Sequence, residues 1–202
     1  SHAEICKETG YPVSLTSKYP IEVISRIRKG VSHGGIHAQI KGINILVLHL
    51  YPQSYAPSGS TAANGDAYRL EEIQTYLDNT VRKYPDEKYW LMMGDFNSAS
   101  PLDKNDLASG SNINYQVHQT ILDSGYRDPI REMNVNFVRS CPTVYGGWTG
   151  PTGSYKGSRI DFIYASGEAM RNMLNAQILM DDFTDNYSDH YPVTVTCRIY
   201  NK

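Results

Sequence analysis

The 202-residue sequence has few cysteines, and its three, Cys6, Cys141 and Cys197, lie far apart. It contains no CxxC pair and no mixed cysteine and histidine spacing, the patterns typical of zinc sites. The HxH and HExxH patterns of zinc hydrolases are also missing. We therefore expect buried or half-buried free thiols, although one disulfide stays open in an oxidising compartment.

The sequence also lacks a strong net charge and a long hydrophobic run. Its formal net charge is -2, so it is not a bulk polycation, and contact with nucleic acid would need a local basic surface. No apolar run is long enough to span a bilayer. No signal peptide is visible, which leaves open a secreted or periplasmic location for a longer precursor.

What remains is the composition of one globular domain over residues 1–202, with 40% apolar and 20% charged residues. Helical spacing of apolar residues predicts helices at 66–84, with Asp66 as N-cap, and at 116–123 and 168–174. Apolar, β-branched runs predict strands at 21–27, 37–40, 43–50, 89–93, 160–164, 176–180 and 191–199. The almost wholly apolar run 43–50 is expected to be covered on both faces. Interspersed strands and helices indicate a layered α/β domain.

Polar side chains follow the predicted strand 89–93. Asp95 and Asn97 stand two residues apart in the sequence GDFN (residues 94–97), so on extended backbone they would face the same side. A carboxylate beside an amide suits oxygen ligation of Mg²⁺ or the orientation of a phosphate and a water. The alternative is an ordinary turn closed by the aspartate side chain.

Three further segments place titratable groups at strand ends. His190 follows Asp189 just before the last strand, where it can act as a general base, or else simply end a loop. Asp161 begins an apolar strand and needs a partner, because an unpaired buried charge is costly. His49 ends another apolar strand, where a hydrogen-bonded core histidine is the plain alternative.

The order of these segments, His49, then GDFN, then RIDF (residues 159–162), then SDHYPV (residues 188–193), resembles the endonuclease/exonuclease/phosphatase superfamily. The resemblance runs from about residue 10 to residue 199, and GDFN and SDH are its most specific parts. It implies a deoxyribonuclease I-like fold: part of a four-layered α/β sandwich, in which two packed, mostly antiparallel sheets are flanked by helices.

The resemblance also implies roles in the hydrolysis of a phosphate ester by in-line attack of water, with Mg²⁺ or Mn²⁺ neutralising charge on the oxygens. Asp95 and Asn97 would bind or orient the metal-bound phosphate and the water, with Asp189 as a further metal ligand or its neighbour. Asp161 would hydrogen-bond His190, the general base or transition-state stabiliser. His49 would contact the phosphate or protonate the leaving oxygen.

One departure from the family pattern is expected to matter. The family begins with a strand ending in Asn and another ending in a Gln-Glu pair whose Glu is the principal Mg²⁺ ligand, and neither is present before His49. The sequence therefore resembles the C-terminal portion of an N-terminally truncated domain. We expect impaired activity, and exposed strand edges that favour dimerisation.

The substrate is open: a small phosphoester, a lipid head group or a nucleic acid. Trp148 could stack on a base or sugar and Arg159 could contact phosphate, although these side chains could equally serve packing. The second hypothesis is a non-catalytic module that binds a phosphorylated ligand or a partner protein, for which the absent metal carboxylate leaves room.

Overall fold

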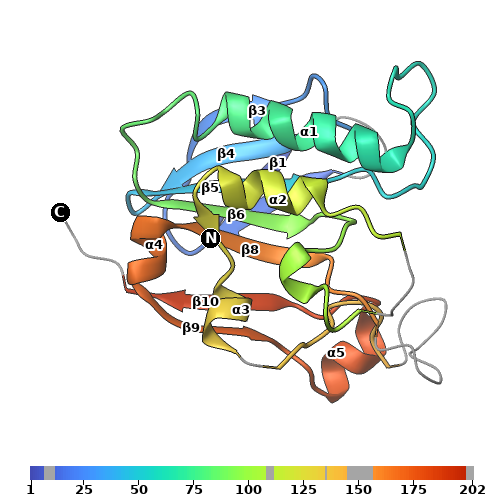
Figure 1. The fold of residues 1–202 in the computed structure, drawn as a ribbon. Helices are drawn as coiled ribbons and strands as arrows, with labels where there is room; N and C mark the ends of the chain where they lie inside the picture. The colour runs from blue at the N-terminus through green and yellow to red at the C-terminus, as the bar shows by residue number, and fades with distance from the viewer. Residues whose placement is uncertain (7–11, 108–111, 135, 145–156, 199–202) are drawn as a thin grey trace.

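A computed structural model describes residues 1–6, 12–107, 112–134, 136–144 and 157–198. Its centre is a six-stranded sheet with the order β3-β4-β5-β6-β8-β7 (Figure 1). Two separate two-stranded ribbons, β1-β2 and β9-β10, complete the β structure of the described part. The predicted α/β class is confirmed: helices and sheets form an α/β sandwich.

The central sheet begins with an antiparallel meander of β3 (Glu22–Ile27), β4 (Gly35–Ile40) and β5 (Ile43–His49). Next to β5 lies β6 (Trp90–Asp95), the one parallel neighbour in this sheet, and then antiparallel β8 (Asp161–Ser166) with the short β7 (Tyr126–Arg127) at the edge. The predicted hairpin over 37–50 is confirmed. The dimer predicted from exposed strand edges stays a prediction.

Two helices cover one face of the sheet, α1 (Gly65–Asn79) and α2 (Gln116–Asp123) (Figure 1). Along β5, side chains alternate between the two faces, so Leu46 and Leu48 are buried in the core beneath the helices, whereas Ile45 and Val47 face the other way. Burial of β5 on the second face is only partial, which corrects the expectation of full cover on both faces.

The first ribbon packs on that second face. It pairs β1 (His2–Cys6) with β2 (Val13–Ser17), and its buried Cys6, Val13 and Leu15 meet Ile36 and Ala38 of β4. The second ribbon pairs β9 (Met173–Ile178) with β10 (Val193–Cys197). Cys6, Cys141 and Cys197 are free thiols, two of them buried and the last half-buried, as expected from their spacing.

The helix ends follow local chemistry more closely than the sequence pattern indicates. Asn64, not Asp66, caps α1, because its Oδ1 accepts the Ala67 N–H at 2.9 Å. The helix ends at Asn79 rather than at the predicted residue 84. At this end the hydroxyl of the capping residue Thr80 donates to the Tyr76 carbonyl at 2.6 Å. Helix α2 has the predicted bounds.

Three short helices complete the described part of the chain: α3 (Pro129–Met133), α4 (Gly167–Arg171) and α5 (Asp182–Tyr187). A 3₁₀ turn, η1 (Pro101–Asp103), follows the GDFN segment. No helix among the described residues is long and apolar enough to cross a membrane.

Candidate active site

Three neighbouring strands bring His49, Asp95 and Asp161 into one row. His49 ends β5 and is paired with Asp95 at the end of parallel β6, and Asp95 is paired with Asp161 at the start of antiparallel β8. Side chains opposite one another in a sheet lie within contact distance on the same face. The register alone therefore gathers residues that are far apart in the sequence.

Close approach of β5 and β6 depends on Gly94. Its φ of 147° is unfavourable for residues with a side chain, and an added Cβ would lie 1.8 Å from the Leu48 carbonyl oxygen. No other residue fits between the two strands at this point. The glycine of GDFN thus sets the spacing of His49 and Asp95.

The GDFN segment forms the turn that its composition indicates, and its Asp95 side chain faces the site. The Asn97 backbone N–H donates to Asp95 Oδ1 at 2.8 Å, and Asn97 Nδ2 donates to the Leu50 carbonyl at 2.9 Å. Asn97 adopts a positive φ of 47°, which asparagine tolerates. The first bond fixes the Asp95 carboxylate at the end of β6, and the second ties the turn to the residue that follows β5.

Asp161 and His190 form a hydrogen-bonded pair, with Asp161 Oδ2 2.8 Å from His190 Nδ1. This contact, followed by one with the thiol of Cys141, raises the pKa of His190 to about 11. The imidazole is therefore held as a cation through neutral pH, with its Nδ1–H fixed on the carboxylate.

The pKa of the Asp95 carboxyl is also raised, but for a carboxyl this shift favours the uncharged form. Burial, and next the nearby Asp161 carboxylate, raise its pKa to about 7. The Asp95 side chain is 19% exposed, so little water offsets the charge. One site thus holds a carboxyl that ionises near neutrality beside an imidazole whose pKa lies well above neutrality.

His49 stands next to Asp95 with an open ring nitrogen. Its Nε2 lies 3.6 Å from Asp95 Oδ2 and is buried without a hydrogen-bond partner among the described residues. Burial, followed by the charges of His33 and His190, lowers the pKa of His49 to about 4, so the imidazole is neutral. The unpaired Nε2 distinguishes this ring from a core histidine with both nitrogens hydrogen-bonded.

A second histidine, His33, supports His49 and has no signal in the sequence motifs. The two rings stack with centroids 4.1 Å apart and planes at 7°. Ser32 Oγ lies 2.8 Å from His33 Nδ1 and donates to the wholly buried Glu72 at 2.6 Å. Glu72 and Ser32 thus hold the His33 ring, and His33 in turn holds the His49 ring through stacking.

A hollow of about 420 Å³ opens on this group. It is lined by Asp95, Asp161 and His190 at its polar end and by Val47, Met93 and Val193 elsewhere. Asp189 is exposed and is not part of the group of close ligand atoms formed by Asp95, Asp161 and His190. Trp148 lies outside the described residues.

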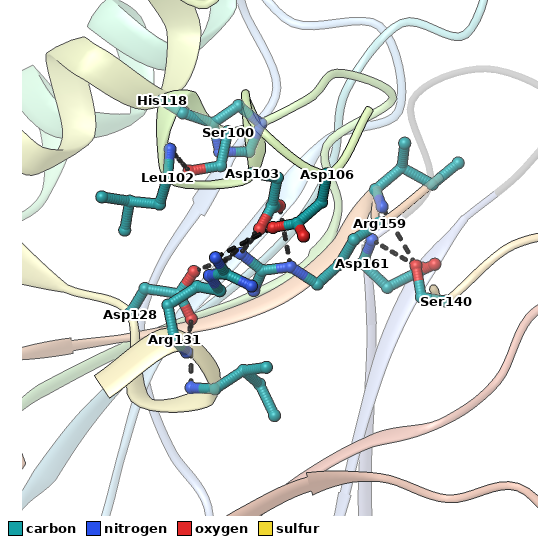
Figure 2. A network of polar contacts seen from close by, with 12 residues as sticks. Ser100, Leu102, Asp103, Asp106, His118, Asp128, Arg131, Ser140, Arg159 and Asp161 are labelled. Carbon is teal, nitrogen blue, oxygen red and sulfur yellow. Dashed lines mark hydrogen bonds and ion pairs between the residues drawn. The ribbon is translucent and has the colours of Figure 1, made fainter. Parts of the chain in front are cut away.

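Arg159 is buried in a cluster of ion pairs, which fits the packing alternative better than contact with phosphate. It is 1% exposed, and its guanidinium bonds both carboxylate oxygens of Asp103, at 2.9 and 3.0 Å, and Asp128 at 2.6 Å (Figure 2). Arg131 adds a link to Asp106 at 3.0 Å. The cluster ties the segment after GDFN to β8 and α3 and so stiffens the scaffold beneath the site.

Replacing Arg159 with glutamine is expected to destabilise the protein by about 3 kcal/mol, because it leaves two buried carboxylates without their main cation. Urea unfolding at pH 7 measures this. The matched control is Arg171→Gln, which removes the ion pair with Glu168 at a side chain that is 72% exposed, and should change stability by less than about 0.5 kcal/mol. Equal effects of the two substitutions would contradict the buried role of Arg159.

Fold and site together define an α/β-sandwich protein with a paired-carboxylate and histidine centre at the ends of its central strands. The chain belongs to the Endonuclease/Exonuclease/phosphatase family, whose sequence profile matches residues 7–190. It is thus a hydrolase of the type that acts on phosphoester bonds. No curated protein sequence matches it significantly.

Solved structures with the same fold include two nucleic-acid enzymes. The 3′ phosphatase NExo from Neisseria, bound to a product DNA hairpin, has a TM-score of 0.70 and 17% identity, and the match covers 98% of this chain and 79% of that one. An AP endonuclease from Archaeoglobus fulgidus has a TM-score of 0.69 and 20% identity, covering 97% and 79%. At such identities the likeness concerns the fold.

Proposed function

We propose that this chain hydrolyses a phosphate ester by attack of water, with Mg²⁺ or Mn²⁺ as cofactor. The observation that supports this most strongly is the group formed by Asp95, Asp161 and His190. It combines a carboxyl with a pKa of about 7 and an imidazole with a pKa of about 11 in one small polar site. Environments that push two titratable groups apart in this way are typical of acid–base pairs.

The residues present fit a divalent cation. Asp95 and Asp161 each offer a carboxylate oxygen, and these oxygens lie within 4.8 Å of each other and of a ring nitrogen of His190, which as a cation is a neighbour of the ion and not a ligand. Two half-buried carboxylates repel each other, and a cation between them would offset that repulsion. Asp95 and Asp161 would hold the ion, with the Asn97 amide oxygen and Asp189 as further ligands. A bound Mg²⁺ or Mn²⁺ would supply charge neutralisation at the phosphate oxygens.

Asp95 and His190 then have separate tasks. Without a cation Asp95 ionises near pH 7, and as a ligand it would be held ionised, so it would orient the metal-bound phosphate and the attacking water. His190 stays protonated, so it serves as the donor that stabilises negative charge on a phosphate oxygen rather than as the base. Asp161 keeps the ring oriented through Nδ1.

His49 supplies a neutral ring beside this pair. Its Nε2 is buried and unpaired among the described residues, so it can hydrogen-bond a phosphate or leaving-group oxygen that enters the site. We assign it to substrate orientation. With its low pKa it carries no charge at neutral pH and is a weak proton donor to the leaving oxygen.

The structural relatives suggest which phosphoesters to test first. The two described above are named as a 3′ phosphatase with a DNA product and as an AP endonuclease. We propose nucleic-acid phosphoesters as the leading substrate class, with small phosphoesters and lipid head groups as alternatives. The net charge of -2 argues against tight, nonspecific binding of duplex DNA.

The test is turnover of a panel: DNA with a 3′ phosphate, DNA with an abasic site, a nitrophenyl phosphodiester and sphingomyelin vesicles. We expect hydrolysis of at least one member with Mg²⁺ or Mn²⁺, and its loss in EDTA. Weak turnover by this chain stays a prediction. Turnover that persists in EDTA, or binding of a phosphorylated ligand without any turnover, would refute the proposal, and the second result would support a binding module.

A further inference from the structure

A short segment, residues 139–144, lies between the two parts of the chain that carry Asp161 and His190. We propose that Ser140, at the centre of this segment, is a positioning residue that sets the distance between Asp161 and His190. The proposal rests on the proposed function for its kinetic consequence, but its geometric claim stands separately. Ser140 is wholly buried, so it does not contact substrate itself.

Toward Asp161, the Ser140 hydroxyl is the anchor. Its Oγ accepts the backbone N–H groups of Ile160 at 3.0 Å and of Asp161 at 3.1 Å (Figure 2). The Ser140 backbone N–H also donates to the Ser158 carbonyl at 2.9 Å. The start of β8, and with it the Asp161 carboxylate, is therefore fixed relative to Ser140.

Toward His190, the same residue uses its backbone. The Ser140 carbonyl accepts the N–H of Tyr191, the next residue after His190, at 2.7 Å. Thr143 adds two bonds to this part of the chain: its N–H donates to the Asp189 carbonyl at 3.1 Å and its hydroxyl to the Ser188 carbonyl at 2.5 Å. His190 is thus held between two hydrogen-bonded neighbours.

No pair of hydrogen-bonded strands among the described residues joins Asp161 to His190. Asp161 starts β8 of the central sheet, whereas His190 precedes β10, which belongs to a separate ribbon. Their 2.8 Å contact therefore depends on connections outside the sheets, and Ser140 bonds to both sides. A catalytic hydrogen bond is sensitive to displacements of a few tenths of an ångström, so loss of one anchor should loosen it.

The experiment is Ser140→Ala, which removes the hydroxyl and keeps the backbone bonds. The matched control is Ser166→Ala at the opposite end of β8, where Ser166 Oγ likewise accepts backbone N–H groups, from Trp90 at 3.0 Å and Ala169 at 3.4 Å. We expect kcat to fall about tenfold or more in Ser140→Ala with KM changed less than about twofold, and Ser166→Ala to keep wild-type kcat at a similar loss of stability.

A direct readout separates this proposal from the proposed function. The downfield Nδ1–H resonance of His190, assigned by its absence in His190→Gln and recorded at one fixed pH, should shift and exchange faster in Ser140→Ala but not in Ser166→Ala. It needs no turnover. If Ser140→Ala does not fold, Thr143→Val tests the other end of the segment and should change the same resonance. An unchanged resonance, or equal kinetic loss in both serine variants, would overturn the proposal.

Discussion

Replacing Asp95 with asparagine is expected to lower kcat on the order of 10³-fold. The substitution keeps the shape and the hydrogen bond from the Asn97 N–H, but removes one of the two carboxylates that would hold the cation and orient the attacking water. Steady-state turnover of the best substrate in the panel measures the loss. Asp123→Asn, on the surface of α2 in a contact with Gln119, is a control that should keep wild-type kcat.

The same variant should also change how stability depends on pH. Burial and Asp161 raise the Asp95 pKa from 3.8 to about 7 in the folded protein, so this carboxyl contributes stability below about pH 4 that is lost as the pH rises to about 7. At about 1.4 kcal/mol per pKa unit, the loss over this range is on the order of 4 kcal/mol. In urea unfolding with EDTA present, the free energy of unfolding of Asp95→Asn should therefore rise relative to that of wild type between pH 5 and pH 8. Parallel curves for the two proteins would sink the assignment of a high pKa to Asp95.

The second large effect is expected at His190. Replacing it with glutamine retains a hydrogen-bond donor but removes the cation that Asp161 stabilises, and kcat should fall about 10²- to 10⁴-fold across the neutral range. The loss should not be recovered at lower pH, because the wild-type ring is already protonated there. His2→Gln, at an exposed position of β1, serves as the control.

Combining variants tests whether Asp161 acts through His190. Asp161→Asn alone should lower kcat less than His190→Gln, and the double variant should be no worse than His190→Gln, since the carboxylate has no ring left to orient. Multiplicative losses in the double variant would show instead that Asp161 acts mainly elsewhere, for example on the cation. Either result shows whether Asp161 contributes mainly by orienting His190 or mainly by binding the cation.

The central strands and the gathering of His49, Asp95 and Asp161 could be predicted from the sequence because each depends on local signals. Apolar runs fix the strands, and a polar residue where such a run ends falls at the edge of the sheet. The pairing of His49 with Asp95 and of Asp95 with Asp161 then follows from the parallel and antiparallel registers. The resemblance to a known family supplied the expectation of two packed sheets, whereas the order of the strands comes from the structure.

Arg159 shows what such signals miss. A charged residue just before a strand reads as exposed, because the carboxylates that neutralise it stand far away in the sequence, Asp103 at a separation of 56 residues and Asp128 at 31. This cation can be buried stably only because folding brings both carboxylates into contact with it. The supporting residues His33 and Ser140 escaped notice for the same reason, since their contacts are tertiary.

The elements that the sequence pattern did not predict are short and partly polar. In β2, Val13 and Leu15 alternate with serine and threonine, and the ribbon becomes stable only against Ile36 and Ala38 of β4. Helix α5 has six residues, and a capping box at Asp181 and Thr184 defines its start. Tertiary packing and single side-chain bonds decide such elements, so periodicity carries little information about them.

The parallel pairing of β5 with β6 determines where insertions and deletions can be tolerated in this chain. The two strands are joined by a long excursion through residues 50–89, so additions or deletions in the loop before α1 leave the register untouched. A single residue gained or lost inside 43–49 would instead turn the imidazole at position 49 to the opposite face. Length variation among descendants of this gene should therefore concentrate in that excursion and spare the strand.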